Sequence, residues 1–505
     1  MKLVVGNVET KVITGGKDNL LPFNIIDELR KYLRVKVDGY HYAMQSGRRW
    51  DGWRYFITPS GKFATGFLPK VINYLEELGV KDIEIEDERG ELPKLNPEID
   101  NYIGNIHGEE WEARDYQVTM VSRLNNYITY GGNKKLYFPR GILDCATNAG
   151  KNSMAALIMN NLPKDESIIF MVSSTIIFKQ ALEFFQEVLG KEEIGQVGGG
   201  KVEFRRVTIC MVKTLLNRAK DSANVRKILK ETRVLIVDES DEAGAKEYSK
   251  VLTYIGAGMR VFVSGTPLEA KKVNNMIAVG LSGLVLGKVS NRELIDAGHS
   301  QNPIVNILFC DPKNAGFITY EEEKRKNLHL NRDRAEMVAK LIQKHSDKNI
   351  VVSYIETAHG YYMEEVAKEF NPNVDMAVIH GGSANRESAL EDFKKGKISV
   401  LFTSMILKRG ANIPNIEVLI MAQGGKSTIT IKQLVGRAVR HDGKNSDVLV
   451  YDFYDHNSKH LSKHSRDRIR IYEKEGFDIV KHYNEIRKLA KDDATTKKMM
   501  DKFWE

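Results

Sequence analysis

The sequence predicts an α/β protein built around two parallel sheets, with a small α+β domain before them and a helical tail after them. Between Trp111 and about Phe453, short apolar runs rich in β-branched residues alternate with stretches of helical spacing. The runs are continuously apolar, which is typical of strands covered by helices on both faces. They form two groups, 167–174, 207–212, 233–239 and 259–266 in the first and 348–356, 374–382, 398–404, 417–423 and 447–453 in the second.

Composition along the chain gives the domain boundaries. The stretch between the two groups is rich in glycine and contains Pro303, so we place a boundary near residue 300. The first 95 residues show short strand-like pieces and one helical stretch at 68–78, and the residues after 456 keep helical spacing without further apolar runs. We therefore expect four parts: 1–95, 96–300, 301–456 and 457–505.

The overall composition is that of a globular protein with several domains. Of the 505 residues, 42% are hydrophobic and 28% are charged, and no apolar run approaches the ~20 residues that span a bilayer. Cys145, Cys210 and Cys310 are odd in number and lie in or beside apolar runs, which favours buried thiols. The N-terminus meets a charge before any signal-like stretch, so we expect a cytoplasmic protein. The net charge of +8 permits a nucleic-acid partner without demonstrating one.

A candidate phosphate-binding loop lies at 146–152, Ala-Thr-Asn-Ala-Gly-Lys-Asn, between the apolar run 138–146 and a predicted helix at 153–159. Small residues leave backbone N–H groups free to bind phosphates at a helix N-terminus, and Lys151 adds a charge for the β and γ phosphates. The usual loop has Ser or Thr after the lysine to ligate Mg²⁺, whereas this chain has Asn152. Either the amide holds Mg²⁺ in an altered way or hydrolysis is weakened. A plain polar turn is the alternative interpretation.

A pair of carboxylates ends the predicted strand 233–239. In this pair, Asp238 would hold Mg²⁺ and Glu239 would orient, or take a proton from, the water that attacks the γ phosphate. Acidic residues after a strand often serve only to solvate a loop. A phosphate loop about 85 residues upstream makes the catalytic interpretation the stronger one.

Two arginines recur at helical spacing in 433–444. Gln433, Arg437 and Arg440 would share one side of a helix, with Gly436 between them. Such arginines are often only solvated. The apolar residues beside them would bury the helix and direct the guanidinium groups toward a crevice, which is the chemistry of an arginine finger.

These motifs in this order, with Ser264-Gly265-Thr266 after a strand, resemble those of superfamily 2 helicases over residues 111 to about 453. The resemblance implies two tandem RecA-like motor domains that use ATP and Mg²⁺. The segment 403–414 resembles the family's motif that couples the two domains, and Asn412 stands in it where the family more usually has Asp. The implied nucleotide contacts are Arg114, Tyr116, Gln117, Thr147, Asn148, Ala149, Gly150, Lys151, Asn152 and Gly410, and the implied nucleic-acid contacts are Ser174, Thr175, Thr214, Gly381 and Thr403.

A narrower resemblance comes from the two ends of the chain. The segment 50–56, which contains Trp-Asp-Gly, is similar to the accessory domain of the UvsW-type phage helicases, and the glycines 198–200 and the tail 460–477 also resemble that group. Those enzymes act on branched DNA in recombination and stalled-fork processing. The resemblance therefore implies DNA with forks or Holliday junctions as the partner and, for a phage protein, the host-cell cytoplasm as the location.

Basic and aromatic residues alternate in the N-terminal part. The cations Arg48, Arg49 and Arg54 can bind phosphates, while Trp50 and Trp53 can stack on unpaired bases. The two tryptophans could equally form the core of a small β domain, which would leave the arginines solvated.

Three functional hypotheses follow. The first is an ATP-dependent DNA helicase or branch-migration motor, with ATP held between the two α/β domains. The second is a translocase that moves along duplex DNA without separating its strands. The third is a nucleic-acid-binding protein with a degenerate ATP site, which Asn152 motivates. RNA stays open as a substrate, because motor motifs grip a backbone that both polymers share.

Overall fold

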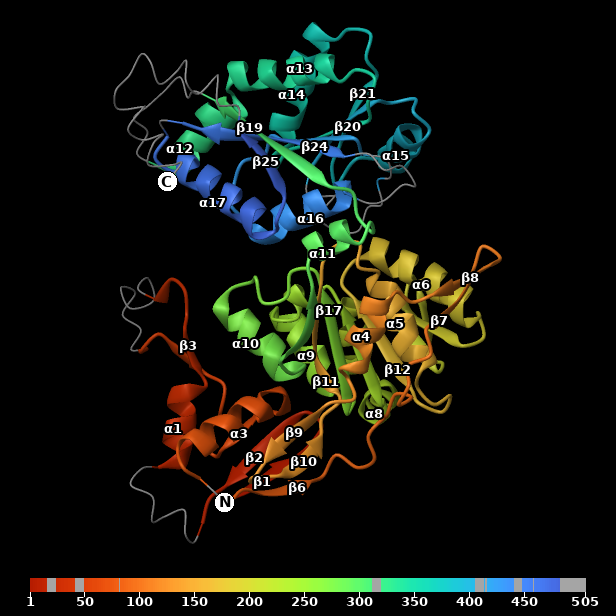
Figure 1. The fold of residues 1–505 in the computed structure, drawn as a ribbon, viewed down its shortest axis with the longest axis vertical. Helices are drawn as coiled ribbons and strands as arrows, with labels where there is room; N and C mark the ends of the chain where they lie inside the picture. The colour runs from red at the N-terminus through yellow and green to blue at the C-terminus, as the bar shows by residue number, and fades with distance from the viewer. Residues whose placement is uncertain are drawn as a thin grey trace. The chain divides into compact units, whose positions relative to one another are not determined.

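The computed structural model describes residues 1–15, 24–40, 50–80, 82–310, 319–404, 413, 416–439, 447–456 and 458–481. The chain forms two compact units, Met1–Val289 and Ser290–Glu505. Each unit contains one large sheet of mainly or wholly parallel strands (Figure 1). The predicted pair of α/β layers is therefore confirmed.

The large sheet of unit 1 has eight strands, all parallel to their neighbours except the edge strand β14. Its strand order places the loop after β11 and the end of β16 at the same edge, with β17 between them. In spatial order the strands are β14 (Lys201–Glu203), β13 (Ile194–Gly198), β15 (Val207–Met211), β12 (Ile168–Val172), β16 (Val234–Asp238), β17 (Met259–Ser264), β11 (Arg140–Cys145) and β18 (Val285–Val289).

Helices cover both faces of this sheet. Successive residues of β12 point to opposite sides, so Phe170 packs edge-to-face on Phe185 at 4.9 Å while Ile169 and Met171 join the core on the other face. This double coverage explains why the strands read as continuous apolar runs. The helices of this region are α4 (Asp115–Ser122), α5 (Lys151–Asn160), α6 (Thr175–Leu189), α7 (Val212–Asp221), α8 (Ala223–Glu231), α9 (Lys246–Tyr254) and α10 (Lys272–Leu281).

The N-terminal segment packs on the same core. Its four-stranded sheet has the order β5-β2-β1-β6, and a Cβ at Gly66 would lie 2.1 Å from the Val279 carbonyl, so the two backbones are in direct contact. One hydrophobic cluster runs from Leu3 to Leu281. The elements are β1 (Lys2–Val5), β2 (Glu9–Ile13), α1 (Ile25–Tyr32), β3 (Arg34–Lys36), β4 (Trp53–Tyr55), β5 (Lys62–Ala64), α3 (Leu68–Glu77) and β6 (Glu84–Asp87), followed by the hairpins β7 (Tyr102–Ile106) with β8 (Glu109–Glu112) and β9 (Tyr127–Tyr130) with β10 (Lys134–Tyr137).

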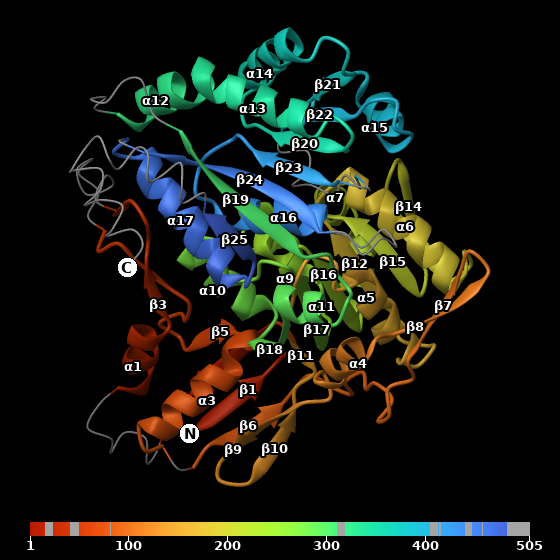
Figure 2. The ribbon, with the colours of Figure 1, turned by 45° about the horizontal axis from the view of Figure 1, so that its top comes forward.

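The sheet of unit 2 has seven strands, all parallel. Figure 2 shows α13 and α14 on one face of it and α16 and α17 on the other, in agreement with the two separate core clusters of this unit. The strands are β21 (Met376–Ile379), β22 (Val400–Thr403), β20 (Ile350–Ser353), β23 (Val418–Met421), β24 (Val448–Asp455), β19 (Pro303–Cys310) and β25 (Asp478–Lys481), and the helices are α11 (Asn291–Asp296), α12 (Tyr320–Glu323), α13 (Arg332–Lys344), α14 (Thr357–Phe370), α15 (Arg386–Lys394), α16 (Thr428–Ala438) and α17 (Leu461–Lys474).

The C-terminal tail differs from the helical extension that we predicted. After α17 the chain forms β25, which pairs in parallel with β19 and completes the edge of the sheet. Tyr472 and Phe477 are buried in the core of unit 2. The apolar residues of the tail are too few to show a run of their own, but they extend a core that the rest of the unit has already built.

The expectation for the cysteines agrees with the structure. All three are buried and form no disulfide, and burial raises the pKa of each thiol. Among the described residues, no helix is both long and apolar enough to cross a membrane.

Candidate nucleotide site and nucleic-acid contacts

The predicted phosphate loop connects β11 to α5, which begins at Lys151 and so includes Asn152 in its first turn. Asn148 and Gly150 adopt left-handed backbone conformations, with φ of 77° and 71°. A Cβ at Gly150 would lie 2.4 Å from Nε2 of Gln117, so only glycine fits there. No side chain caps α5, which leaves the N–H groups of its first turn suited to an anion.

Three of the residues that the resemblance implies as nucleotide contacts form a hydrogen-bonded group beside the loop. Tyr116 Oη and Gln117 Nε2 both donate to the carbonyl oxygen of Ala149, at 3.0 and 2.8 Å. The backbone N–H of Arg114 donates to Oε1 of Gln117 at 2.9 Å, and its Nη1 donates to Tyr116 Oη at 3.2 Å. The structure thus brings Arg114, Tyr116, Gln117 and the loop together. Both polar atoms of the Gln117 amide are hydrogen-bonded within the protein, so this amide positions the loop.

The predicted acidic pair lies beside the loop lysine. Lys151 Nζ is 2.6 Å from Oε1 of Glu239 and 3.7 Å from Oδ1 of Asp238. Glu239 has a left-handed φ of 52°, and its N–H donates to Asp238 Oδ1 at 2.9 Å. Burial raises the pKa of Asp238 to about 6, while the charge of Lys151 opposes that rise. The buried carboxylate is therefore a group that a further cation would stabilise.

The segment after β17 lies against the phosphate loop. A Cβ at Gly265 would lie 3.1 Å from the carbonyl oxygen of Cys145 and 3.5 Å from the backbone nitrogen of Thr147. The hydroxyl of Ser264 accepts from the N–H of Thr266 at 3.2 Å. Within the described ranges, the buried hydroxyl of Thr266 makes no hydrogen bond, which fits a site that has room for another polar group.

In unit 2, Gln433 and Arg437 lie on α16 and are each 9% exposed. Ser427 caps this helix by accepting from Thr430 N–H at 3.3 Å. The described helix runs to Ala438, and Arg440 and Gly410 both lie outside the described residues. Thr147 and Gly436 lie in the phosphate loop and on α16, where the sequence placed them.

The residues predicted to contact nucleic acid occupy different environments. Ser174 accepts from Ile177 N–H at 3.2 Å and caps α6. Thr403 is fully buried, and its hydroxyl donates to the Ser404 carbonyl at 3.3 Å. Thr175 begins α6, Thr214 lies in the first turn of α7, and Gly381 follows β21.

The N-terminal tryptophans are not core residues. Trp50 is 38% exposed and its Nε1 donates to the Trp53 carbonyl at 3.1 Å. Trp53 is half-buried, with the guanidinium of Arg34 4.2 Å from its ring centre, and Arg54 is exposed. Of the two interpretations of these aromatics, the core is therefore ruled out. Arg48 and Arg49 lie outside the described residues.

Comparisons with known proteins agree with this geometry. Residues 110–269 match the family described as "Type III restriction enzyme, res subunit", and residues 333–442 match the "Helicase conserved C-terminal domain". Together the two matches span over half of the chain and contain the phosphate loop, the acidic pair and Arg437. The chain belongs to the superfamily 2 helicases and is an ATP-dependent enzyme of that type, as the motifs predicted.

Individual relatives support the same assignment. The ATP-dependent DNA helicase uvsW of Enterobacteria phage T4 is 23% identical over 90% of this chain and 94% of its own length. The DNA 3'-5' helicase XPB of Mycobacterium tuberculosis is 21% identical over 74% of this chain and 66% of its own. A structure of S. cerevisiae Dbp5 bound to RNA and ADP BeF3 covers 75% of this chain and 93% of its own, at 15% identity and a TM-score of 0.51, and shows a shared fold.

Sequence reasoning missed a group of buried charges around α17. Arg468 and Asp452 form an ion pair at 2.8 Å with side chains 1% and 2% exposed, and Lys432 pairs with Glu475 at 2.7 Å. The only signal in the sequence was basic and acidic residues at helical spacing in the tail, which is also the pattern of a solvated helix.

Proposed function

We propose that this protein is a DNA helicase that uses ATP and Mg²⁺ to act on branched DNA. The observation that carries the nucleotide part is the ion-paired group of Lys151, Asp238 and Glu239, which joins the phosphate loop to the end of β16. A lysine at the uncapped start of α5 and a buried carboxylate beside it are the groups that a nucleotide phosphate and its metal ion need.

Each residue has a distinct part in the proposed reaction. The N–H groups of the loop and Lys151 bind the β and γ phosphates, Asp238 and Asn152 would hold Mg²⁺, and Glu239 orients the attacking water. Bound Mg²⁺ would neutralise negative charge on the phosphates. Arg437 stabilises the charge that develops on the transferred phosphoryl group.

DNA as the substrate rests on two relatives whose names describe DNA helicases, one of which this chain matches over almost all of its length. The exposed Trp50 and the cation-bearing hairpin around Trp53 fit a surface that stacks on bases and binds phosphates. Branched DNA is the finer part of the proposal, and it rests on the likeness of the N-terminal Trp-Asp-Gly segment to the UvsW-type helicases.

The decisive test is an ATPase titration with single-stranded, duplex, forked and four-way DNA beside matching RNA. We expect the greatest stimulation by forked or four-way DNA. Equal stimulation by duplex DNA, with triplex displacement but no strand separation on forks, would favour a duplex translocase. Stimulation by RNA alone would overturn the DNA assignment, and γ-phosphate release that no nucleic acid stimulates would indicate a degenerate site.

A further inference from the structure

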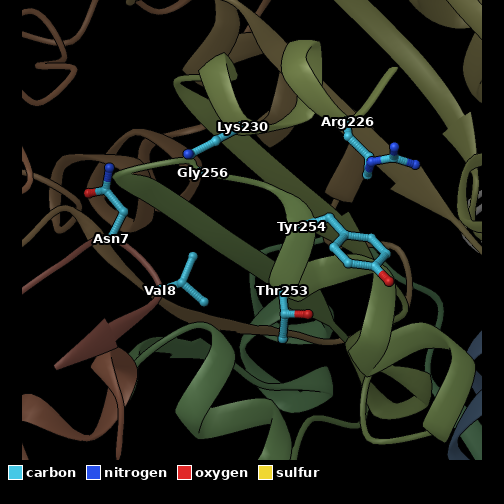
Figure 3. Close-up of a pocket in the computed structure, with 7 residues that line it drawn as sticks. All are labelled: Asn7, Val8, Arg226, Lys230, Thr253, Tyr254 and Gly256. Atoms are coloured by element: carbon cyan, nitrogen blue, oxygen red, sulfur yellow. The ribbon is translucent and has the colours of Figure 1, made fainter. Parts of the chain in front are cut away.

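A hollow of about 470 Å³ lies between the turn that joins β1 to β2 and the helices α8 and α9 of unit 1. Figure 3 shows Asn7 and Lys230 on one side of it and Arg226 and Tyr254 on the other. Both cations come from α8, Asn7 comes from the turn after β1, and Tyr254 ends α9. Among the described residues that line this hollow there are two cations and neither Asp nor Glu, so its charged side chains favour a negatively charged ligand.

Among the described residues, no ion pair neutralises either of the two cations. Nη1 of Arg226 donates to the carbonyl oxygens of Ala219 and Lys220, at 2.8 and 3.0 Å, which fixes the guanidinium group without neutralising it. In the described part of the chain, neither Arg226 nor Lys230 has a carboxylate within ion-pair distance. By contrast, Lys227 on the same helix is paired with Glu231 at 4.0 Å.

The backbone around the hollow is held in place. The carbonyl of Asn7 accepts from Nη1 of the buried Arg140 at 2.8 Å. The N–H of Gly256 donates to the Leu229 carbonyl at 2.9 Å, and a Cβ at Gly256 would lie 2.0 Å from the Lys230 carbonyl, so α8 packs directly on this loop.

This hollow is separate from the nucleotide site. Lys230 lies just before β16 and Gly256 just before β17, so both lie at the N-terminal ends of the strands. The phosphate loop follows the C-terminal end of β11, which runs parallel to β17. The two sites therefore lie at opposite ends of the parallel strands of one sheet.

We propose that the hollow binds a phosphate group, with Arg226 and Lys230 supplying the charge and Asn7 a polar contact. The phosphate could belong to a nucleic-acid backbone or to a free anion, and both sources use the same recognition chemistry. Two cations four residues apart on α8 would hold one phosphate or two neighbouring ones.

The test compares the full-length double variant R226A/K230A with the control K220A/K227A, which removes two charges from α7 and α8 outside the hollow. Anisotropy titrations measure DNA affinity across salt concentrations. Thermal unfolding measures stabilisation by sodium phosphate against sodium chloride at equal ionic strength. If DNA supplies the phosphate, the double variant loses about tenfold in affinity and its salt slope falls by about one to two, while the control changes little.

If a free anion is the ligand, phosphate raises the unfolding temperature of the parent and the control but loses part of that effect in R226A/K230A. The lysine and arginine of the hollow are exposed, so the variant is expected to fold. Identical behaviour of the double variant and the control in both measurements would overturn the proposal and leave the hollow as a site for ordered water.

A second group of buried polar contacts, between α17 and α16, holds α16 in place. Lys432 of α16 and Glu475 at the end of α17 pair at 2.7 Å, with both side chains only 10% exposed. The other carboxylate oxygen of Glu475 accepts from Nδ2 of Asn291 at 2.7 Å. Both oxygens are therefore engaged, and the position of this carboxylate is fixed.

Arg468 fixes the start of the same helix. Its Nη1 donates to the carbonyl of Gly425, just before α16, at 2.7 Å, and its Nε donates to Asp452 at 2.8 Å. Arg468 is 1% exposed, and Tyr472 Oη also donates to Asp452 at 2.8 Å. Through Arg468 and Glu475, α17 and the residue that ends it therefore contact both the segment just before α16 and the middle turn of α16.

We infer that Lys432, Glu475 and Arg468 are positioning residues for Arg437, which lies five residues after Lys432 on α16. This inference rests on the proposed role of Arg437. Residues 461–475 lie beyond the matched helicase region 333–442, so an element outside that region sets the geometry of an arginine within it. A displacement of ~1 Å in a catalytic group can cost up to ~10²-fold in rate.

The test uses E475Q, the charge reversal K432E/E475K, and the control R470Q, which removes an exposed charge from α17. We expect E475Q to lower kcat about tenfold while the KM for ATP stays within about twofold. The reversal should recover most of the rate because it restores the ion pair. A purely structural pair would lower the unfolding temperature without changing kcat, and that result would overturn the inference.

R437A, measured in parallel, distinguishes a failure of the proposed role of Arg437 from a failure of the positioning role. If R437A leaves turnover intact, the proposed function of Arg437 fails. If R437A lowers turnover but E475Q does not, only the positioning role fails.

Discussion

The candidate site residues of the two units are held in place in different ways. In unit 1, Lys151 begins α5, while Asp238 ends β16 and Glu239 follows it. Gly150 and Glu239 have left-handed backbones, and the charges of this site pair with each other. In unit 2, Arg437 lies within the regular helix α16. Lys432 of the same helix forms an ion pair with Glu475, more than 40 positions along the chain. The first site combines unusual local backbone conformations with an ion pair between residues 88 positions apart, whereas the second site lies on a regular helix that is held by contacts with another helix.

This difference teaches which positions tolerate change. A loop whose φ values are positive depends on glycine at one position, because any Cβ meets Gln117. A helix that is held by buried ion pairs depends on every partner, because removing one charge leaves the other buried and unpaired. The predictions below test this contrast.

The largest expected effect is that of K151A. Removing this charge should abolish ATP hydrolysis, to below ~1% of the parent rate, because the loop lysine serves the phosphates directly. DNA affinity should stay within a few fold. Steady-state ATPase and anisotropy measure the two quantities, and K164A, an exposed lysine of the same unit, is the control. Hydrolysis above ~10% of the parent rate would contradict the assignment of the loop.

R437A should lower turnover about 10²-fold and leave nucleotide affinity nearly intact, because an arginine finger acts on charge that develops in the transition state. Equilibrium binding of a labelled nucleotide and single-turnover hydrolysis measure the two effects. A parallel loss of binding and turnover would make Arg437 an ordinary ground-state ligand.

Unit 2 should lose stability in mild acid. Burial lowers the pKa of His359 well below its usual value and also lowers that of His329, whose ring stacks on it at 4.8 Å. The neighbouring Arg334 also lowers the pKa of His359, while Glu356 opposes the shift of His329. The unfolded chain therefore binds these protons more readily than the folded chain does. The free energy of unfolding is therefore greatest above about pH 6.5. It decreases as the pH is lowered further, by at most ~1.4 kcal/mol per pH unit for each histidine.

Urea unfolding between pH 5 and 8 measures this slope. H359F keeps a buried ring that cannot titrate, so it should flatten the pH dependence. An equal slope in H359F and the parent would show that His359 does not titrate in this range.

The smallest expected effect is that of N152T. A hydroxyl beside Lys151 should lower the Mg²⁺ concentration for half-maximal ATPase by a few fold, since Thr or Ser is the usual ligand at this position. ATP turnover measured against Mg²⁺ with forked DNA present tests it. No change, or a loss, would mean that Asn152 is a working part of this site.

Much of the nucleotide site could be predicted from the sequence. The loop 146–152 and the pair Asp238-Glu239 each follow an apolar run, and parallel strands bring their carboxyl ends to one edge of the sheet. The start of α5 was predicted two residues late, because the hydrophobic pattern of a helix begins after its first polar turn. That Gln117 binds the loop carbonyl could not be predicted, since it depends on how α4 packs.

The sequence by itself determined the two parallel sheets, the phosphate loop, the acidic pair and the helix that carries Arg437, because each is encoded in a local run of residues. Tertiary structure alone decided that the tail completes the second sheet, that Glu475 and Arg468 hold α16, and that Arg226 and Lys230 line a hollow. In these cases the partners lie far apart in sequence, and a charged residue on an amphipathic helix looks the same whether it faces water or a buried partner.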